Sequence, residues 1–193
     1  DYSAAISNLA LLYQTIGNYT AAEALFLEAI DIFEEVLGDK HPDYATALIN
    51  LALLYDDIGN FDAALPLYIK AVKIDKVALG EKDPSYAIDL SNLAGLYTEM
   101  GNYSAAEPLY IEAKKIRKEV LGVKHTAYAS SLNNLAFLYV AMGNYSEVEP
   151  LYIEAMNIRK EVLGDKHPLY ASSLNNLATL YQDMGNYPAA ELL

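Results

Sequence analysis

The sequence predicts an all-α protein made of an array of antiparallel helix pairs. Three observations predict it: a 42-residue repeat runs through the 193-residue chain, apolar side chains recur at helical spacing inside each copy, and glycines stand where helices should end. Two series of glycines show the period: Gly17, Gly59, Gly101, Gly143 and Gly185, and then Gly38, Gly80, Gly122 and Gly164.

The period divides the chain into repeats at approximately residues 1–42, 43–84, 85–126 and 127–168, with a partial repeat at 169–193. No long linker or low-complexity stretch interrupts the pattern, so we expect a single solenoid of about four and a half repeats. Because the pattern is already running at residue 1 and stops inside a copy, we expect the chain to be a fragment of a longer protein.

Tyrosine follows the same period. All 17 tyrosines fall into four columns, which begin at residues 2, 13, 19 and 26, and the two gaps in these columns are filled by Phe26 and Phe61. Aromatic residues that are absorbed so completely by one period indicate packing between repeats rather than a cofactor site.

The first helix of each pair, here called helix A, is clearest in the second copy. Leu48, Leu51, Ala52 and Tyr55 are spaced as i, i+3, i+4 and i+7, which is the spacing of one buried helical stripe. Gly59 follows and is expected to end the helix.

A histidine or aspartate stands just before each helix A, at positions 41, 83, 125 and 167. Asp is among the best N-cap residues, and proline, which favours the first helical position, follows at three of the four sites. We therefore interpret His41, His125 and His167 as cap or turn residues, and we predict no metal site, cofactor or catalytic residue.

The second helix of each pair, helix B, is expected to begin at a Ser/Thr-x-x-Glu capping box and to end at a glycine such as Gly38. The boxes begin at Thr20, Ser104 and Ser146. Helix B also carries a proline near the expected end of its first turn, where the missing N–H costs at most about one helical bond. These prolines are Pro66, Pro108 and Pro150.

The repeat resembles the tetratricopeptide (TPR) repeat, and more narrowly the 42-residue repeats of kinesin light chains and their prokaryotic relatives. The residues that carry the resemblance include Asn50-Leu51-Ala52, Tyr55, Gly59, Phe61, Ala64, Tyr68 and Ala71, together with residues 132–136, 106–110 and 158–168. The resemblance implies a right-handed superhelical solenoid that binds other proteins. HEAT or armadillo repeats, whose period is similar, are the alternative fold.

Composition removes several classes of function. The formal net charge of −13 disfavours nucleic acid and anionic membranes, which both require excess Lys and Arg. No segment is long and apolar enough to predict a membrane span. The chain has no cysteine, which excludes disulfides and thiolate chemistry and fits a cytoplasmic location. No phosphate loop, nucleophile elbow or paired-carboxylate setting stands out, so we do not expect an enzyme.

The face of helix A that is turned away from the buried stripe contains the candidate binding residues. In TPR proteins this face lines the inner groove of the solenoid, and the resemblance implies the same here. The predicted peptide-binding groove consists of Asn8, Asn50, Leu53, Asp56, Asp57, Asn92, Glu99, Asn133, Asn134, Phe137, Asn175 and Asn176.

Asparagine recurs in this groove at positions 8, 50, 92, 134 and 176, although it is a poor residue for a helix interior. Each amide either forms hydrogen bonds with a neighbouring helix or binds the backbone of a bound peptide. The sequence leaves both interpretations open. No Lys or Arg occurs on any helix A. Basic residues cluster late in helix B, as at Arg117 and Arg159, where we expect them to face solvent.

The leading functional hypothesis is a non-enzymatic scaffold that binds an extended peptide or helix of another protein in this groove. The acidic groove favours a neutral, apolar or basic ligand over an acidic one. The alternative is a structural spacer or an array that self-associates through its open ends.

Overall fold

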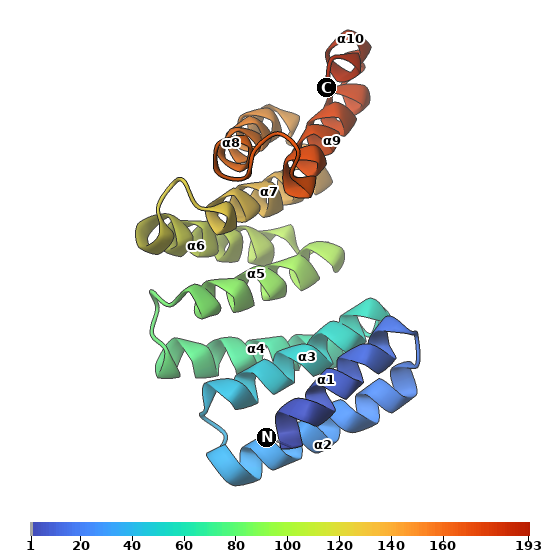
Figure 1. Ribbon diagram of the computed structural model, residues 1–193, viewed down its shortest axis with the longest axis vertical. Coiled ribbons are helices and arrows are strands. Elements are labelled where there is room, and N and C mark those ends of the chain that lie inside the picture. Colours follow the sequence, from blue (N-terminus) through green and yellow to red (C-terminus); the bar gives the residue numbers. More distant parts are fainter. Residues whose placement is uncertain (1) are drawn as a thin grey trace. The chain divides into compact units, whose positions relative to one another are not determined.

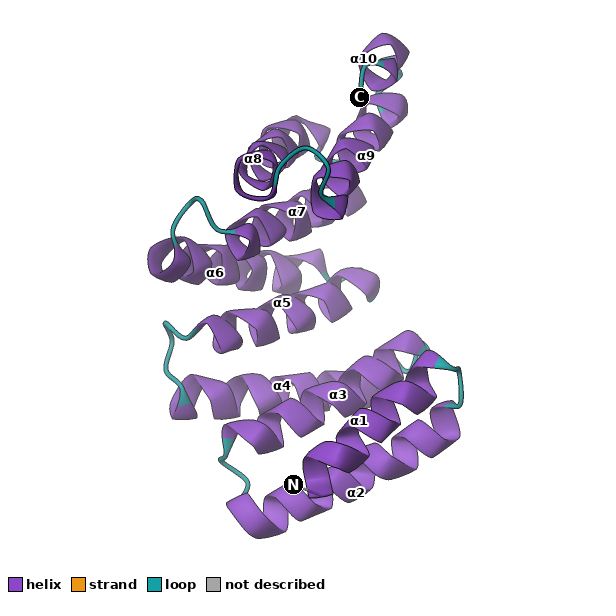
Figure 2. Ribbon diagram, in the orientation of Figure 1, coloured by secondary structure: helices purple, strands orange, loops and turns teal. Residues whose placement is uncertain are grey.

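The computed structural model describes residues 2–193, and the regular secondary structure in this range is entirely helical (Figures 1 and 2). The helices are α1 (Tyr2–Thr15), α2 (Tyr19–Leu37), α3 (Pro42–Asp57), α4 (Phe61–Ala78), α5 (Pro84–Glu99), α6 (Tyr103–Leu121), α7 (Thr126–Ala141), α8 (Tyr145–Leu163), α9 (Pro168–Asp183) and α10 (Tyr187–Glu191). Odd-numbered helices are the predicted helices A, and even-numbered helices are the predicted helices B.

The chain forms two compact units, one up to Leu96 and one from Tyr97 onward. In the first unit α1 packs on α2, α2 on α3 and α3 on α4, so the helix B α2 contacts the helix A on either side of it in the sequence (Figure 1). Alanines with no exposed surface, such as Ala22 and Ala52, let the helix axes approach, and the larger Phe26 and Tyr68 fill the space between them.

The second unit repeats this arrangement, with contacts of α7 to α6 and α8, of α8 to α9, and of α9 to α10. Its core has two clusters. One surrounds Tyr128, Leu132 and Ile158, and the other surrounds Val148 and Leu177. Tyr68 and Tyr128 are therefore packing residues, as the sequence predicted. The column that begins at residue 19 is less buried than expected, because Tyr19, Tyr145 and Tyr187 are exposed.

Glycine ends the helices where the sequence predicted. Gly59, in the turn between α3 and α4, has φ of 73°, and Gly122, the C-cap of α6, has φ of 84°. A side chain would be strained at such angles even though a Cβ at either site would have open space around it.

The histidine column caps helix A, which confirms that prediction. The Nδ1 atoms of His41, His125 and His167 each accept a hydrogen bond from a backbone N–H two residues on, at 3.1 Å. Asp83 does the same for α5, since its Oδ1 atom accepts from Ser85 N at 2.7 Å.

The predicted capping boxes of helix B are wrong. The helices begin one residue before Thr20, Ser104 and Ser146, and the N-cap residue is an asparagine of the preceding turn. Asn18 Oδ1 accepts from Ala21 N at 3.3 Å. The side chains of Asn102 and Asn144 make no such bond. Because the helices start earlier than expected, the prolines of α4, α6 and α8 lie in the second turn rather than the first.

Candidate functional site

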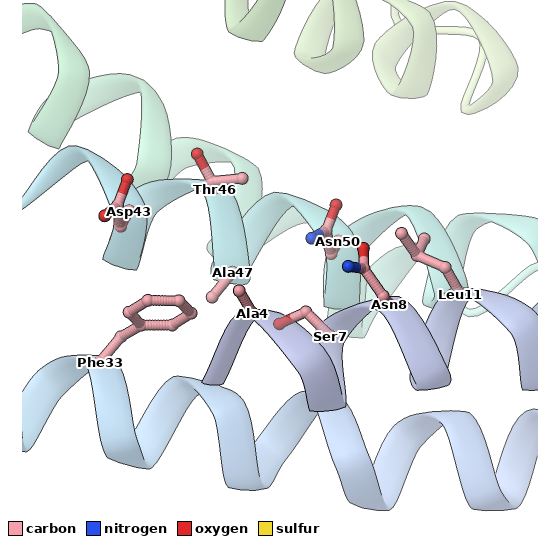
Figure 3. A pocket seen from close by; sticks show the side chains of 9 residues that line it. All are labelled: Ala4, Ser7, Asn8, Leu11, Phe33, Asp43, Thr46, Ala47 and Asn50. Atoms are coloured by element: carbon pink, nitrogen blue, oxygen red, sulfur yellow. The ribbon is translucent and has the colours of Figure 1, made fainter. Parts of the chain in front are cut away.

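The exposed face of helix A contains a hollow in the first unit (Figure 3). It has a volume of about 270 Å³ and lies between α1 and α3, with Phe33 of α2 beside it. Asn8 and Asn50 of the predicted groove both line it, and Figure 3 shows their side chains next to each other. The full lining is Ala4, Ser7, Asn8, Leu11, Phe33, Asp43, Thr46, Ala47 and Asn50.

A second hollow, of about 230 Å³, lies in the second unit between α7 and α9. The predicted groove residues Phe137 and Asn176 line it together with Tyr152 of α8. The remaining lining residues are Val140, Thr179, Leu180 and Asp183. Each hollow thus carries one carboxylate, and neither lining includes a Lys or Arg.

The other predicted groove residues line neither hollow. Some are exposed on their helices: Leu53, Asp57, Glu99 and Asn175. Others are half-buried: Asp56, Asn92, Asn133 and Asn134. The structure therefore brings together two subsets of the predicted groove, one in each unit, and it leaves the rest outside both hollows.

The two hollows occupy different ends of helix A, and a side chain closes the other end in each unit. In the first unit Gln14 Nε2 donates to Asp57 Oδ2 at 2.6 Å across α1 and α3. In the second unit the equivalent residues, 126 positions later, are Val140 and Asp183. Because valine has no donor, this end stays open there and forms the second hollow.

Arg159 closes the opposite end in the second unit. It is only 5% exposed and lies between α7, α8 and α9. Its Nη1 atom donates to Ser173 Oγ at 2.8 Å and to the Leu169 carbonyl at 3.4 Å, and its Nη2 atom donates to Ser130 Oγ at 3.4 Å. The side-chain amide of Asn133 is oriented with its oxygen toward Arg159. In this orientation Asn133 Oδ1 accepts a hydrogen bond from Nη1 at 2.8 Å.

The expectation that the late arginines of helix B face solvent is therefore wrong for Arg159, and also for Arg117. Arg117 is 6% exposed and donates to Ser131 Oγ at 2.8 Å. Burial lowers the pKa of both guanidinium groups, but bonds to hydroxyl oxygens compensate for part of the lost hydration. The position of these arginines in the sequence did not predict their burial, because a basic residue near a helix C-terminus interacts favourably with the helix dipole when it is exposed as well.

The position of these arginines forms a variable column, occupied in order by Phe33, Asp75, Arg117 and Arg159. Fourteen residues later the next helix A presents a second column, made of Ala47, Asp89, Ser131 and Ser173. The hydrogen bonds of Arg117 and Arg159 join these columns directly. Each junction between helix B and the next helix A therefore has its own chemistry: apolar, acidic, or arginine with serine.

The acidic junction is a buried pair of carboxyl groups, since Asp75 and Asp89 are 3% and 4% exposed. Burial, the hydrogen bond with Asp75 and the charges of Asp75 and Asp83 raise the pKa of Asp89 to about 8. Burial also raises the pKa of Asp75. Near neutral pH the protonated Asp89 therefore donates a hydrogen bond to Asp75.

Tyrosine hydroxyls tie successive helix pairs together. Tyr55 donates to Glu23 of the preceding pair at 2.6 Å, and Tyr139 donates to Glu107 at 2.9 Å. Burial and the partner carboxylate raise the pKa of both phenols to about 12. The Ser/Thr-x-x-Glu pattern assigned these glutamates to capping boxes. Their constant 32-residue offset from the tyrosine column was the signal that could have identified the bonds.

Within residues 2–193 no group of three or more His, Asp or Glu side chains is placed to hold a metal ion. None of the helices in this range is both long enough and apolar enough to cross a lipid bilayer. What the hollows offer chemically is hydrogen bonding, one carboxylate each and apolar contact.

Comparison with known families identifies the repeat. The tetratricopeptide repeat model matches four overlapping stretches, residues 1–77, 57–119, 85–152 and 128–193. This chain belongs to the tetratricopeptide repeat family. The predicted all-α fold of antiparallel helix pairs is thereby confirmed, and the TPR fold is consistent with a scaffold for protein interactions.

Solved structures place the chain near kinesin light chain-like members of the TPR family. BtubC (BKLC) from P. vanneervenii is 28% identical, with a TM-score of 0.84 over 97% of this chain and 74% of its own. A Podosopora anserina protein described as a kinesin light chain with nearly identical TPR-like repeats is 26% identical. Its TM-score is 0.82, and the match covers 97% of this chain and 89% of the other.

A more distant TPR structure is the Rap protein complexed with the Competence and Sporulation Factor, at 17% identity and a TM-score of 0.78. It covers 96% of this chain and 50% of the Rap chain, so it supports the fold alone. A comparison with curated proteins found no match.

Proposed function

We propose that this TPR chain is a non-enzymatic scaffold that holds an extended peptide segment of a partner protein against the exposed faces of its helices A. The observation that carries the proposal is the pair of hollows, one in each unit. Each lies between successive helices A, and each includes an asparagine of the predicted column, Asn50 in one and Asn176 in the other.

The amides of these asparagines suit a peptide backbone. An Asn side chain offers a carbonyl acceptor and two N–H donors, which match the donor and acceptor that each ordinary peptide unit presents. Asn50 is only half-buried. Its amide therefore remains accessible to a ligand beside the apolar surfaces of Leu11 and Phe33.

The charge of the hollows favours a neutral, apolar or basic ligand. Asp43 and Asp183 are the charged groups of the two linings. Lys40, Lys70 and Lys73 line a different hollow on the helix B side. A carboxylate-rich ligand would therefore be attracted to that hollow rather than to the faces of helices A.

Titration with fluorescent peptides of equal length tests this function. Three pools with basic, neutral or acidic variable positions should bind in that order of affinity. Replacing Asn50 and Asn176 together by Ala should weaken the basic pool about tenfold, because either hollow then lacks this asparagine amide for the peptide it holds.

Asn157→Ala is the matched control, because Asn157 is exposed on α8 and lines neither hollow. It should leave affinity unchanged. Tighter binding of the acidic pool, or equal loss in the control, would contradict the proposal. Concentration-dependent oligomers that bind no pool would instead support the structural spacer.

A further inference from the structure

The hollow of the first unit lies at the repeat position that the Arg159 guanidinium fills in the second unit. A shift of 126 residues, three periods, relates Arg159 to Phe33. The same shift relates four hydrogen-bond partners of Arg159, namely Ser130, Asn133, Leu169 and Ser173, to Ala4, Ser7, Asp43 and Ala47. All five of these equivalents line the hollow of about 270 Å³.

The substitutions explain why the space is empty in one unit and filled in the other. Phe33 has no polar end to extend along α1, and Ala4 and Ala47 lack the hydroxyls that Ser130 and Ser173 offer to Arg159. Figure 3 shows the Phe33 ring lying near Asp43 and Ala47, with Ala4 and Ser7 beyond.

Every polar side chain that lines this hollow can accept a hydrogen bond, although the amides of Asn8 and Asn50 also carry N–H donors. Ser7 Oγ already donates its proton to the Ser3 carbonyl at 2.8 Å, and Thr46 Oγ1 donates to the Pro42 carbonyl at 3.1 Å. Both hydroxyl oxygens therefore face a ligand with lone pairs. Asp43 adds a carboxylate, which the first residues of α3 hold at the edge of the hollow.

The second unit shows that hydroxyls in this state accept from a guanidinium. Ser173 Oγ donates to the Leu169 carbonyl at 3.1 Å while it accepts from Arg159 at 2.8 Å. Ser130 Oγ donates to the Thr126 carbonyl at 3.1 Å while it accepts from Arg159 at 3.4 Å. Ser7 and Thr46 have the same bond to the carbonyl four residues earlier.

The geometry points to an arginine pocket: the hollow of Phe33 and Asp43 takes the side chain of an arginine from a bound peptide. A guanidinium carries only donors, so it matches a lining rich in acceptors. Asp43 supplies a charge-assisted bond, and the Phe33 ring supplies a surface for stacking. This inference rests on the proposed peptide-binding function and names the side chain that the first unit selects.

Alanine methyl groups report occupancy of the pocket directly. In protein labelled at alanine methyls, an acetylated and amidated Ala-Ala-Arg-Ala-Ala peptide should shift the NMR signals of Ala4 and Ala47 in a saturable way. The same peptide with citrulline, which keeps the shape but loses the charge, should bind about tenfold more weakly. Equal binding of the citrulline peptide would overturn the arginine assignment.

Two variants test the pocket itself. Asp43→Asn should weaken the arginine peptide about tenfold, because the charge-assisted bond is lost. The matched control is Asp62→Asn, which changes an exposed acid in the first turn of α4 that does not line the hollow, and it should have no effect. Equal weakening in both variants would show only a general charge effect and would overturn the pocket.

The double variant Phe33→Arg with Ala47→Ser copies the Arg159 and Ser173 pair into the first unit. The new guanidinium should fill the pocket, so the arginine peptide should no longer shift Ala4 while the circular dichroism spectrum stays helical. Retained peptide shifts in this folded variant would overturn the inference.

The pocket and the scaffold fail in different ways. If the basic pool binds but Ala4 and Ala47 do not respond to the arginine peptide, the arginine pocket is wrong and the scaffold stands. If neither the pools nor the arginine peptide bind, both are wrong.

Discussion

Asp89 occupies the repeat position that Ser131 and Ser173 occupy in later repeats, so a carboxyl group replaces a hydroxyl there. Its partner Asp75 stands where later repeats have arginine. Two carboxyl groups in a buried junction are tolerated only while one of them keeps its proton, because two buried like charges repel and neither is solvated. The proton on Asp89 is thus part of the packing between α4 and α5.

This pair makes the stability of the first unit depend on pH. The folded pKa of Asp89 is raised from 3.8 to about 8, so its stabilising contribution is fully present below about pH 4 and is lost as pH rises through about 8. Urea unfolding followed by circular dichroism should give a lower midpoint at pH 9 than at pH 6.

Asp89→Asn should reduce this fall, because the amide still donates to Asp75 but does not ionise. Asp165→Asn, which changes an exposed acid in the turn before α9, should keep the wild-type pH dependence. A variant at position 89 with an unchanged pH profile would show that the buried pair does not control it.

At the scale of the helix, the N-caps of helices A vary between histidine and aspartate on one backbone geometry. His125 Nδ1 accepts from Ala127 N at 3.1 Å, and Asp83 accepts from the equivalent N–H at 2.7 Å. The carboxylate also interacts favourably with the positive end of the helix dipole, which a neutral imidazole does much less.

His125→Asp should therefore stabilise the protein by about 0.5 kcal/mol, and His125→Ala should destabilise it by about 1 kcal/mol through loss of the cap. Denaturant titration at pH 7 measures both changes. Both variants leave the hollows intact, so peptide affinity should not change. If His125→Ala were as stable as the wild type, the observed cap would contribute nothing.

At the scale of the whole molecule, the formal net charge of −13 acts on any charged ligand before it reaches a hollow. Long-range attraction between exposed charges is screened with a Debye length of about 10 Å at 0.1 M salt. The charge therefore influences the rate of association more than the final contacts.

The association rate constant of the basic peptide pool should fall about tenfold between 20 mM and 500 mM salt, whereas that of the neutral pool should change little. Stopped-flow fluorescence measures both. Asp43→Asn should preserve most of this salt dependence, because it removes only one of many negative charges. A rate constant for the basic pool that rises with salt would contradict electrostatic steering.

The periodicity of the sequence was sufficient to predict the helix pairs, their turns and the packing of buried tyrosines such as Tyr68 and Tyr128. Glycine at positive φ, an N-cap residue and a stripe of apolar side chains act within a few residues of one another, so their consequences are local. His41 and Gly59 illustrate this, because each does in the structure what its neighbours in the sequence imply.

The burial of the Arg159 side chain between α7, α8 and α9 was decided only by the tertiary structure. A basic residue late in a helix gives the same sequence pattern whether it faces water or a neighbouring helix, and the choice depends on partners 10 to 29 residues away. The contrast between the filled site at Arg159 and the open hollow at Phe33 has the same origin. Period and local signals determined the elements, whereas the candidate site depends on which side chains meet when the elements pack.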